Sequence, residues 1–112
     1  VELDPDVAVR TCKKVTDGTC DRGILVCGTG IGMAMTANKV PGIRAAVCHD
    51  PFSTERSILS NDANVMCMGA RVIAPQLALY LLDIWMGLTF KNGPSTPKVE
   101  RSMEYQKEFC GK

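Results

Sequence analysis

Residues 23–32 read Gly23-Ile-Leu-Val-Cys27-Gly-Thr-Gly-Ile-Gly32, a short apolar run followed by three alternating glycines. The run Ile24–Val26 predicts a strand buried on both faces, because parallel strands covered on both sides are continuously apolar. The strand is expected to end at Gly28, where the glycines predict a tight turn. Residues 33–39 then predict a helix that stops before Pro41 and Gly42. The segment should form a strand, a turn and a helix.

The same order of elements recurs along the chain. Apolar runs at 43–48 and 65–68 predict two more strands, and residues 51–59 and 75–85 predict helices that begin with proline. Strands that alternate with helices favour right-handed crossovers and a parallel sheet covered on both faces. We therefore expect an α/β fold, a three-layer α/β/α sandwich with a parallel, Rossmann-like sheet.

Two further helices are expected outside this alternation. Asp4-Pro5-Asp6 places a capping acid before proline, and apolar residues at helical intervals continue toward Gly18. After a polar break at 91–94, residues 99–109 predict a charged amphipathic helix. Three strands make a thin sheet for this class of fold, so a strand or two is expected upstream or from another chain.

Length and charge restrict the classes of protein. The chain has 112 residues, so residues 1–112 are expected to form a single domain. Thirteen Lys and Arg against twelve Asp and Glu leave a net charge of +1, which gives no overall attraction to nucleic acid or an anionic membrane. The apolar stretch 74–90 is interrupted and too short to span a bilayer, so it predicts a buried helix. Without a signal peptide pattern, a cytoplasmic location is expected.

The six cysteines predict thiols rather than a disulfide scaffold. No pair has C-x-x-C spacing, and a chain with this much aliphatic sequence does not need covalent bridges. Cys48 and Cys67 lie in strand-like runs, where free cysteine is a common packing residue. A zinc site is not expected, since the chain has one histidine.

The glycine turn predicts an anion-binding site. Ligands of open α/β sheets bind at the carboxyl ends of the strands, and the amides of a following helix favour a negative charge. The alternative is that the glycines only allow tight packing of strand against helix, although three in five positions exceed what one turn needs. A dinucleotide site would need glycine at Met33, despite Asp50 near the spacing of a ribose-binding acid. The chain has no G-K-[ST] triplet, and a Cys-x5-Arg phosphatase loop would need arginine at Met33.

Cys27 stands at the mouth of this turn. A thiol has a reference pKa of about 8.5, and a nearby helix N-terminus lowers it. Cys27 is thus placed to exist partly as a thiolate, which could act as a base or as a nucleophile.

Five motifs in one order give the chain its resemblance to a known family. The chain resembles the ribose-5-phosphate isomerase B family, which also includes galactose-6-phosphate isomerases, from about Pro5 to Glu100. The motifs are Cys27-Gly-Thr-Gly-Ile-Gly32, Ala37-Asn-Lys39, Pro41-Gly-Ile-Arg-Ala45, Ser60-Asn-Asp-Ala-Asn-Val65 and Gly69-Ala-Arg-Val-Ile73.

The resemblance implies an aldose–ketose isomerase that converts ribose 5-phosphate and ribulose 5-phosphate, or a related sugar phosphate, through an enediolate. In the family, the cysteine of this turn moves a proton between C2 and C1, which assigns Cys27 as the base. The family pattern also implies that Thr29 contacts substrate hydroxyls or the proton path and that Asn61 holds a sugar oxygen. No metal or organic cofactor is implied. The oxyanion pocket would consist of Gly28, Gly30 and Gly32.

The resemblance also suggests groups for the phosphate and for ring opening. Arg71 and Lys98 match phosphate-binding positions, and arginine can hold a phosphate with two hydrogen bonds; the alternative is a solvated surface charge. Many family members carry histidine where this chain has Ser60, and that histidine is thought to open the sugar ring. His49, just past the second predicted strand, could substitute, or could simply be hydrogen-bonded.

The family builds its site between subunits, which implies a homodimer or homotetramer. The helix at 97–110 would lie at the interface through the stripe Val99, Met103 and Phe109. Family members also open with a strand whose acidic turn contacts the substrate, and nothing in this chain matches it. The alternative function is therefore a non-catalytic fragment or companion subunit, which binds a phosphorylated ligand or stabilises a partner chain.

Overall fold

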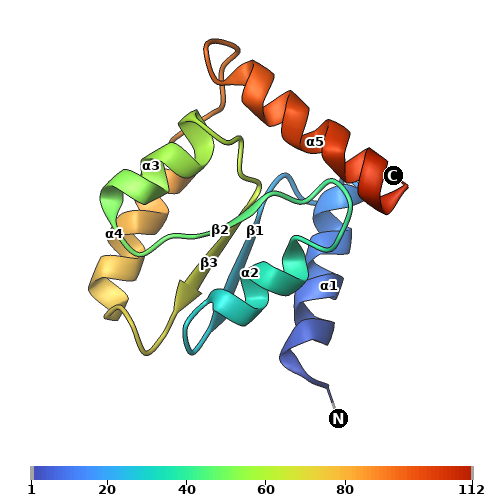
Figure 1. Cartoon of the computed structure of the whole chain (residues 1–112). Coiled ribbons are helices and arrows are strands. Elements are labelled where there is room, and N and C mark those ends of the chain that lie inside the picture. Colours follow the sequence, from blue (N-terminus) through green and yellow to red (C-terminus); the bar gives the residue numbers. More distant parts are fainter. Residues whose placement is uncertain (1, 112) are drawn as a thin grey trace.

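The computed structural model describes residues 2–111, which form a parallel sheet of three strands between helices (Figure 1). The strand order is β1-β3-β2, and both pairings are parallel. This arrangement confirms the predicted α/β class. The elements in chain order are α1 (Asp4–Thr16), β1 (Gly23–Cys27), α2 (Ile31–Ala37), β2 (Ala45–Val47), α3 (Pro51–Leu59), β3 (Val65–Gly69), α4 (Pro75–Met86) and α5 (Thr96–Cys110).

Helix starts follow local hydrogen bonding. α3 begins where predicted, because the Asp50 side chain accepts a hydrogen bond from Ser53 N at 2.8 Å. α1 begins at Asp4 itself, so Asp4 is not the capping acid. Asp6 takes that role, since its carboxylate accepts a hydrogen bond from Leu3 N at 3.0 Å. The helix thus begins one residue earlier than predicted, an error typical of helix ends read from sequence.

Two helix pairs cover opposite faces of the sheet (Figure 1). α1 and α2 pack on one face around Leu25 and Cys67, while α3 and α4 pack on the other around Met66 and Met68. Successive residues of β3 therefore point alternately into two separate cores, and all five are buried. The predicted three-layer sandwich is confirmed.

β1 differs from the prediction of a strand buried on both faces. Gly23 and Leu25 are buried, but Ile24 is 41% and Val26 51% exposed. The reason is that β1 is an edge strand, and the layer of α3 and α4 covers β3 and β2 but leaves this side of β1 open. A continuous apolar run indicates a strand, but it does not show which elements of the fold cover each side of that strand.

α4 is also less buried than predicted. Leu81 and Trp85 are fully buried against the sheet, whereas Leu79, Tyr80 and Met86 are more than half exposed. The helix is apolar around its circumference, but only one side meets the sheet. No helix within residues 2–111 is both long enough and apolar enough to cross a bilayer.

Arg22 connects the start of β1 to the end of α4. Its guanidinium donates to Trp85 O at 2.7 Å and to Leu88 O, and its central carbon lies 5.0 Å from the centroid of the Trp85 ring. A cation at a helix C-terminus interacts favourably with the last carbonyls, and the indole face adds a cation–π contact. Arg22 therefore links the C-terminal end of α4 to the start of the edge strand β1.

Several residues of the family motifs hold the edge strand β2. The Asn38 side chain exchanges two hydrogen bonds with the backbone of Ala45, at 3.0 and 2.8 Å. Asn64 accepts from Arg44 N at 2.7 Å, and the Arg44 guanidinium donates to Asp62 O at 2.5 Å. These side chains replace the backbone partners that a short edge strand lacks.

α5 lies across the end of the molecule where the strands begin (Figure 1). None of its residues is buried, and Gln106 accepts a hydrogen bond from Gly42 N at 3.1 Å. Val99 and Met103 are half-buried against the same chain, whereas Phe109 is 77% exposed. The place of this stripe at a subunit interface stays a prediction.

Replacement of Leu81 by alanine should lower the free energy of unfolding by about 2–5 kcal/mol, because the side chain is fully buried in the α3–α4 core. Leu79, on the same helix and 63% exposed, provides the matched control; its replacement by alanine should cost less than about 0.5 kcal/mol. Urea unfolding followed by circular dichroism measures both. Equal losses would contradict the burial of only one side of α4.

Candidate functional site

The carboxyl ends of the three strands meet at one edge of the sheet. Cys27 at the end of β1 pairs with Gly69 at the end of β3, and Val47 at the end of β2 pairs with Cys67. The glycine turn joins β1 to α2 at this edge. Ligands of open α/β sheets bind at such edges, so the candidate site begins here.

The turn lies directly on the end of β3. A Cβ at Gly69 would lie 2.7 Å from the Thr29 Cα and 2.8 Å from Gly28 O, closer than any side chain allows. Gly30 has a φ of +79°, and a Cβ there would meet the backbone of Met68 at 3.0 Å. Glycine is needed at both positions because two backbones touch without space for a side chain.

Packing does not explain the other two glycines. A Cβ at Gly32 would meet nothing within 4 Å, and a Cβ at Gly28 would be in ordinary contact with the Arg71 side chain at 3.7 Å. Both positions have room for a larger residue. Tight packing of strand against helix therefore explains glycine at residue 30. It does not explain Gly28 and Gly32, where the backbone is open enough for a ligand to approach.

The Cys27 sulfur faces the N–H groups of the turn. Gly30 N donates a hydrogen bond to Sγ at 3.1 Å. Burial of the sulfur opposes ionisation, but hydrogen bonds from the backbone of Thr29, Met33 and Gly30 outweigh it. The pKa of the Cys27 thiol is consequently lowered from its ordinary value.

The buried cysteines behave in the opposite way. Cys12, Cys48 and Cys67 are fully buried free thiols, which confirms the packing role predicted for Cys48 and Cys67. Burial raises the pKa of all three, and for Cys67, with the other thiols nearby, to about 12. Cys27 is thus the thiol whose surroundings favour the charged form.

Arg71 and Thr29 also lie at the glycine turn, and their roles toward a substrate stay predictions. Arg71 N donates to Gly28 O at 3.0 Å, and the stem of its exposed side chain lies over Gly28. Within the described residues its guanidinium forms no ion pair. Thr29 is exposed, and its hydroxyl accepts from Ile31 N at 3.3 Å. Arg71 and Thr29 therefore place a cation and a hydroxyl at the same turn as Cys27.

His49 also lies at this edge, just after β2. Its Nε2 accepts a hydrogen bond from Gly69 N at 2.8 Å. Among residues 2–111, no three His, Cys, Asp or Glu side chains are grouped to hold a metal ion.

Ser60, Asn61 and Lys98 lie at the opposite end of the sheet. α3 starts at the carboxyl edge and runs back for nine residues, about 13 Å, before Ser60 and Asn61 follow it. The Asn61 side chain donates to Arg56 O at 3.0 Å. One chain therefore does not bring these residues to Cys27. A residue that follows a helix in an α/β repeat lies where the next strand begins, which is the signal that could have located Ser60 and Asn61.

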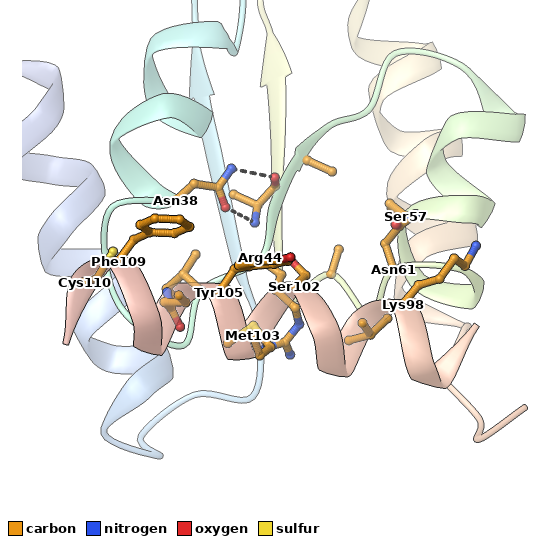
Figure 2. A pocket seen from close by; sticks show the side chains of 16 residues that line it. Asn38, Arg44, Ser57, Asn61, Lys98, Ser102, Met103, Tyr105, Phe109 and Cys110 are labelled. Atoms are coloured by element: carbon orange, nitrogen blue, oxygen red, sulfur yellow. Dashed lines mark hydrogen bonds between the residues drawn. The ribbon is translucent and has the colours of Figure 1, made fainter. Parts of the chain in front are cut away.

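Asn61 and Lys98 instead line a cavity of about 620 Å³ between α5 and the body of the fold (Figure 2). Asn38 and Arg44 line it too, with their polar groups bonded to neighbouring backbone. The sequence did not predict this cavity, because it forms only where α5 folds back over distant residues. Its polar lining is Asn38, Arg44, Ser57, Asn61, Lys98, Ser102, Tyr105 and Gln106.

The chain is similar to known proteins over most of its length. The sequence model of a family described as Ribose/Galactose Isomerase matches residues 4–101. The chain is 51% identical over 102 residues to D-erythrulose-4-phosphate isomerase of Pectobacterium atrosepticum, covering 91% of this chain and 67% of the relative. It is 54% identical over 98 residues to ribose-5-P isomerase B of Listeria innocua, covering 88% and 66%. The chain thus spans about two thirds of the length of these relatives.

Solved structures show the same architecture. Ribose-5-phosphate isomerase B of Clostridium thermocellum superposes with a TM-score of 0.93 at 41% identity, over 96% of this chain and 73% of that one. The type B ribose 5-phosphate isomerase of Trypanosoma cruzi gives a TM-score of 0.92 at 32% identity, over 96% and 72%.

Alkylation with iodoacetamide tests the ionisation of Cys27. In a Cys20→Ser/Cys110→Ser background, which removes the exposed thiols, the rate at Cys27 should rise with pH around a midpoint below about 8.5. The reason is that the lowered pKa leaves more thiolate at neutral pH. Mass spectrometry locates the label, and Cys27→Ser provides the blank. A midpoint at or above that of a free thiol would contradict the prediction.

Proposed function

The chain belongs to the ribose/galactose isomerase family, and from this premise we propose that it is an aldose–ketose isomerase acting on a phosphorylated sugar. The observation that carries the proposal is the Cys27 thiol. Its pKa is lowered, and it sits against a turn with open glycine backbone, where the Arg71 side chain lies over Gly28. A base, N–H donors and a cation are what enediolate chemistry on a sugar phosphate requires.

The proposed reaction proceeds at C1 and C2 of the open-chain sugar. The Cys27 thiolate removes the proton from C2 of the aldose, and the negative charge that develops on O1 is stabilised by N–H groups of the turn. A proton passes from the C2 hydroxyl to O1, with Thr29 in contact with these oxygens. The thiol then returns its proton to C1, which gives the ketose and restores the thiolate.

The remaining predicted residues divide between two chains in this proposal. Arg71 binds the phosphate from the same chain as Cys27. Ser60, the ring-opening candidate, and Asn61 come from a second copy, because α3 carries them to the other end of their own sheet. Lys98 comes from the same copy, since it lies on α5 and lines the cavity there together with Asn61. His49 is the alternative ring-opening group on the Cys27 side. The assembly is then a homodimer or homotetramer with shared sites.

The open side of β1 favours a second candidate function. Ile24 and Val26 are apolar, exposed and on an edge strand, which is a surface that soluble proteins normally cover. We propose that a further strand and helix cover it, supplied upstream or by another polypeptide. If they contribute substrate contacts, the present residues alone act as a companion subunit that binds a phosphorylated ligand or supports a partner without turnover.

The choice of sugar is proposed only at the level of class. Ribose 5-phosphate, paired with ribulose 5-phosphate, is the first candidate, and the four-carbon phosphates named for relatives are the next. These substrates share the C1–C2 unit that faces Cys27 and differ in hydroxyls further along the chain. A single hydrogen-bonded hydroxyl can decide between them.

Replacement of Cys27 by alanine should reduce kcat by roughly 10²–10⁴-fold, because the variant lacks the base. Conversion of a panel of phosphorylated aldoses and ketoses measures the effect, and Cys20→Ser, at an exposed cysteine outside the site, should leave the rates unchanged. Activity that survives in Cys27→Ala would rule out this base. An unmodified protein that turns over none of the panel would favour the companion-subunit function.

Mixing two inactive variants tests the shared site. Cys27→Ala and Asn61→Ala each disable the enzyme, but co-expressed chains should recover about a quarter of the normal activity. Half of randomly mixed dimers are heterodimers, and each of these has one site with both residues intact. Recovery is measured against each variant alone. If Cys27 and Asn61 act within one chain, mixing recovers nothing.

A further inference from the structure

His49 takes the place of a backbone partner at the end of the sheet. β2 ends at Val47, and Cys48 N makes the next ladder hydrogen bond, to Cys67 O at 3.0 Å. Gly69 lies two residues further along β3, so its N–H points to the same side, where no strand continues. The His49 ring fills this gap, with Nε2 2.8 Å from Gly69 N. The imidazole therefore extends the ladder by one hydrogen bond.

This contact defines the form of the ring. Nε2 accepts a hydrogen bond from an amide, so it carries no proton and its lone pair is occupied. The neutral ring holds its proton on Nδ1, and a doubly protonated ring could not make the contact. The neighbouring Asp50 carboxylate is engaged elsewhere, by Ser53 N at 2.8 Å.

The position of Gly69 also determines the position of the glycine turn. Its Cα is packed against the backbone of Gly28 and Thr29 with no room for a methyl group. The segment that follows it binds the same turn, since Ala70 N donates to Cys27 O at 2.8 Å and Arg71 N donates to Gly28 O at 3.0 Å. A displacement of Gly69 therefore moves the turn, including the Thr29 N–H that helps to lower the pKa of Cys27.

We infer that His49 is a positioning residue for the Cys27 base, acting through Gly69 and the turn packed on it; the inference rests on the proposed isomerase function. Without the imidazole, the buried Gly69 N–H loses its acceptor, which costs free energy until the segment shifts to find another. This role competes with ring opening by His49, because both use the Nε2 lone pair. Ring opening then falls to Ser60 of the second copy.

Three variants separate the hydrogen bond from the bulk of the ring. His49→Leu keeps a bulky side chain but has no hydrogen-bond acceptor, and His49→Ala removes the side chain. His49→Gln supplies an acceptor oxygen at similar reach. We expect the pH midpoint of Cys27 alkylation to rise in His49→Leu and His49→Ala and to return toward the original value in His49→Gln. Asp50→Asn, which alters the neighbouring charge and keeps a capping side chain, should leave the midpoint unchanged.

Turnover provides the second readout. Loss of positioning should lower kcat by roughly 10–100-fold with little change in KM, and His49→Gln should recover part of it. The loss should be the same for ribose 5-phosphate and for a tetrose 4-phosphate. The tetrose cannot close a furanose ring, because its O4 carries the phosphate, so it needs no ring opening.

The outcomes decide between the roles. If His49→Leu is folded, as judged by circular dichroism, and the pH midpoint of its Cys27 alkylation is unchanged, the inference is overturned. Loss of turnover confined to ribose 5-phosphate also overturns it and assigns His49 to ring opening. If the unmodified protein turns over no sugar, the proposed function fails, but the alkylation measurements still show whether His49 controls the Cys27 thiol.

Discussion

The contact between Gly69 and the backbone of Gly28 and Thr29 is the constraint on which the site depends. A side chain at residue 69 would push the turn away from the sheet. With glycine there, two carbonyls of the turn region accept hydrogen bonds from Ala70 and Arg71, and the turn closes around the Cys27 sulfur. The lowered pKa of Cys27 follows from this closure, because it needs several N–H groups aimed at one atom.

Most elements of the fold were predictable, because their signals are local. Proline at the starts of α3 and α4, glycine after β1 and apolar runs of strand length are properties of adjacent residues. Which faces of these elements are buried was not predictable in the same way. The exposure of Ile24 and of much of α4 depends on which elements lie beside them, and neither residue type nor periodicity carries that information.

The part of the site formed by residues close together in the sequence was predictable, and the part formed by contacts between distant segments was not. Cys27 and the glycine turn could be placed at the carboxyl edge because a strand end followed by glycines identifies that edge, whereas Thr29 and Arg71 came from the family resemblance. The motifs around Asn38 and Arg44 carried the family resemblance equally well, yet these side chains hold β2. A motif match alone cannot separate a residue that binds substrate from one that binds backbone. The hydrogen bond of His49 is likewise visible only once β2 and β3 lie side by side.

The separation of the two groups of residues has a consequence for specificity. The turn offers mainly backbone N–H groups and one thiol, which in the proposed reaction meet only the C1–C2 unit that all aldose phosphates share. Discrimination among sugars needs side chains that meet the remaining hydroxyls, since a polar group left unpaired in a site is what rejects the wrong substrate. In the proposed assembly one such side chain, Asn61, comes from the far end of a second copy, together with Lys98 for the phosphate. Chemistry and substrate choice then reside on opposite ends of one chain, so either can change in sequence while the Gly69 contact keeps the base in place.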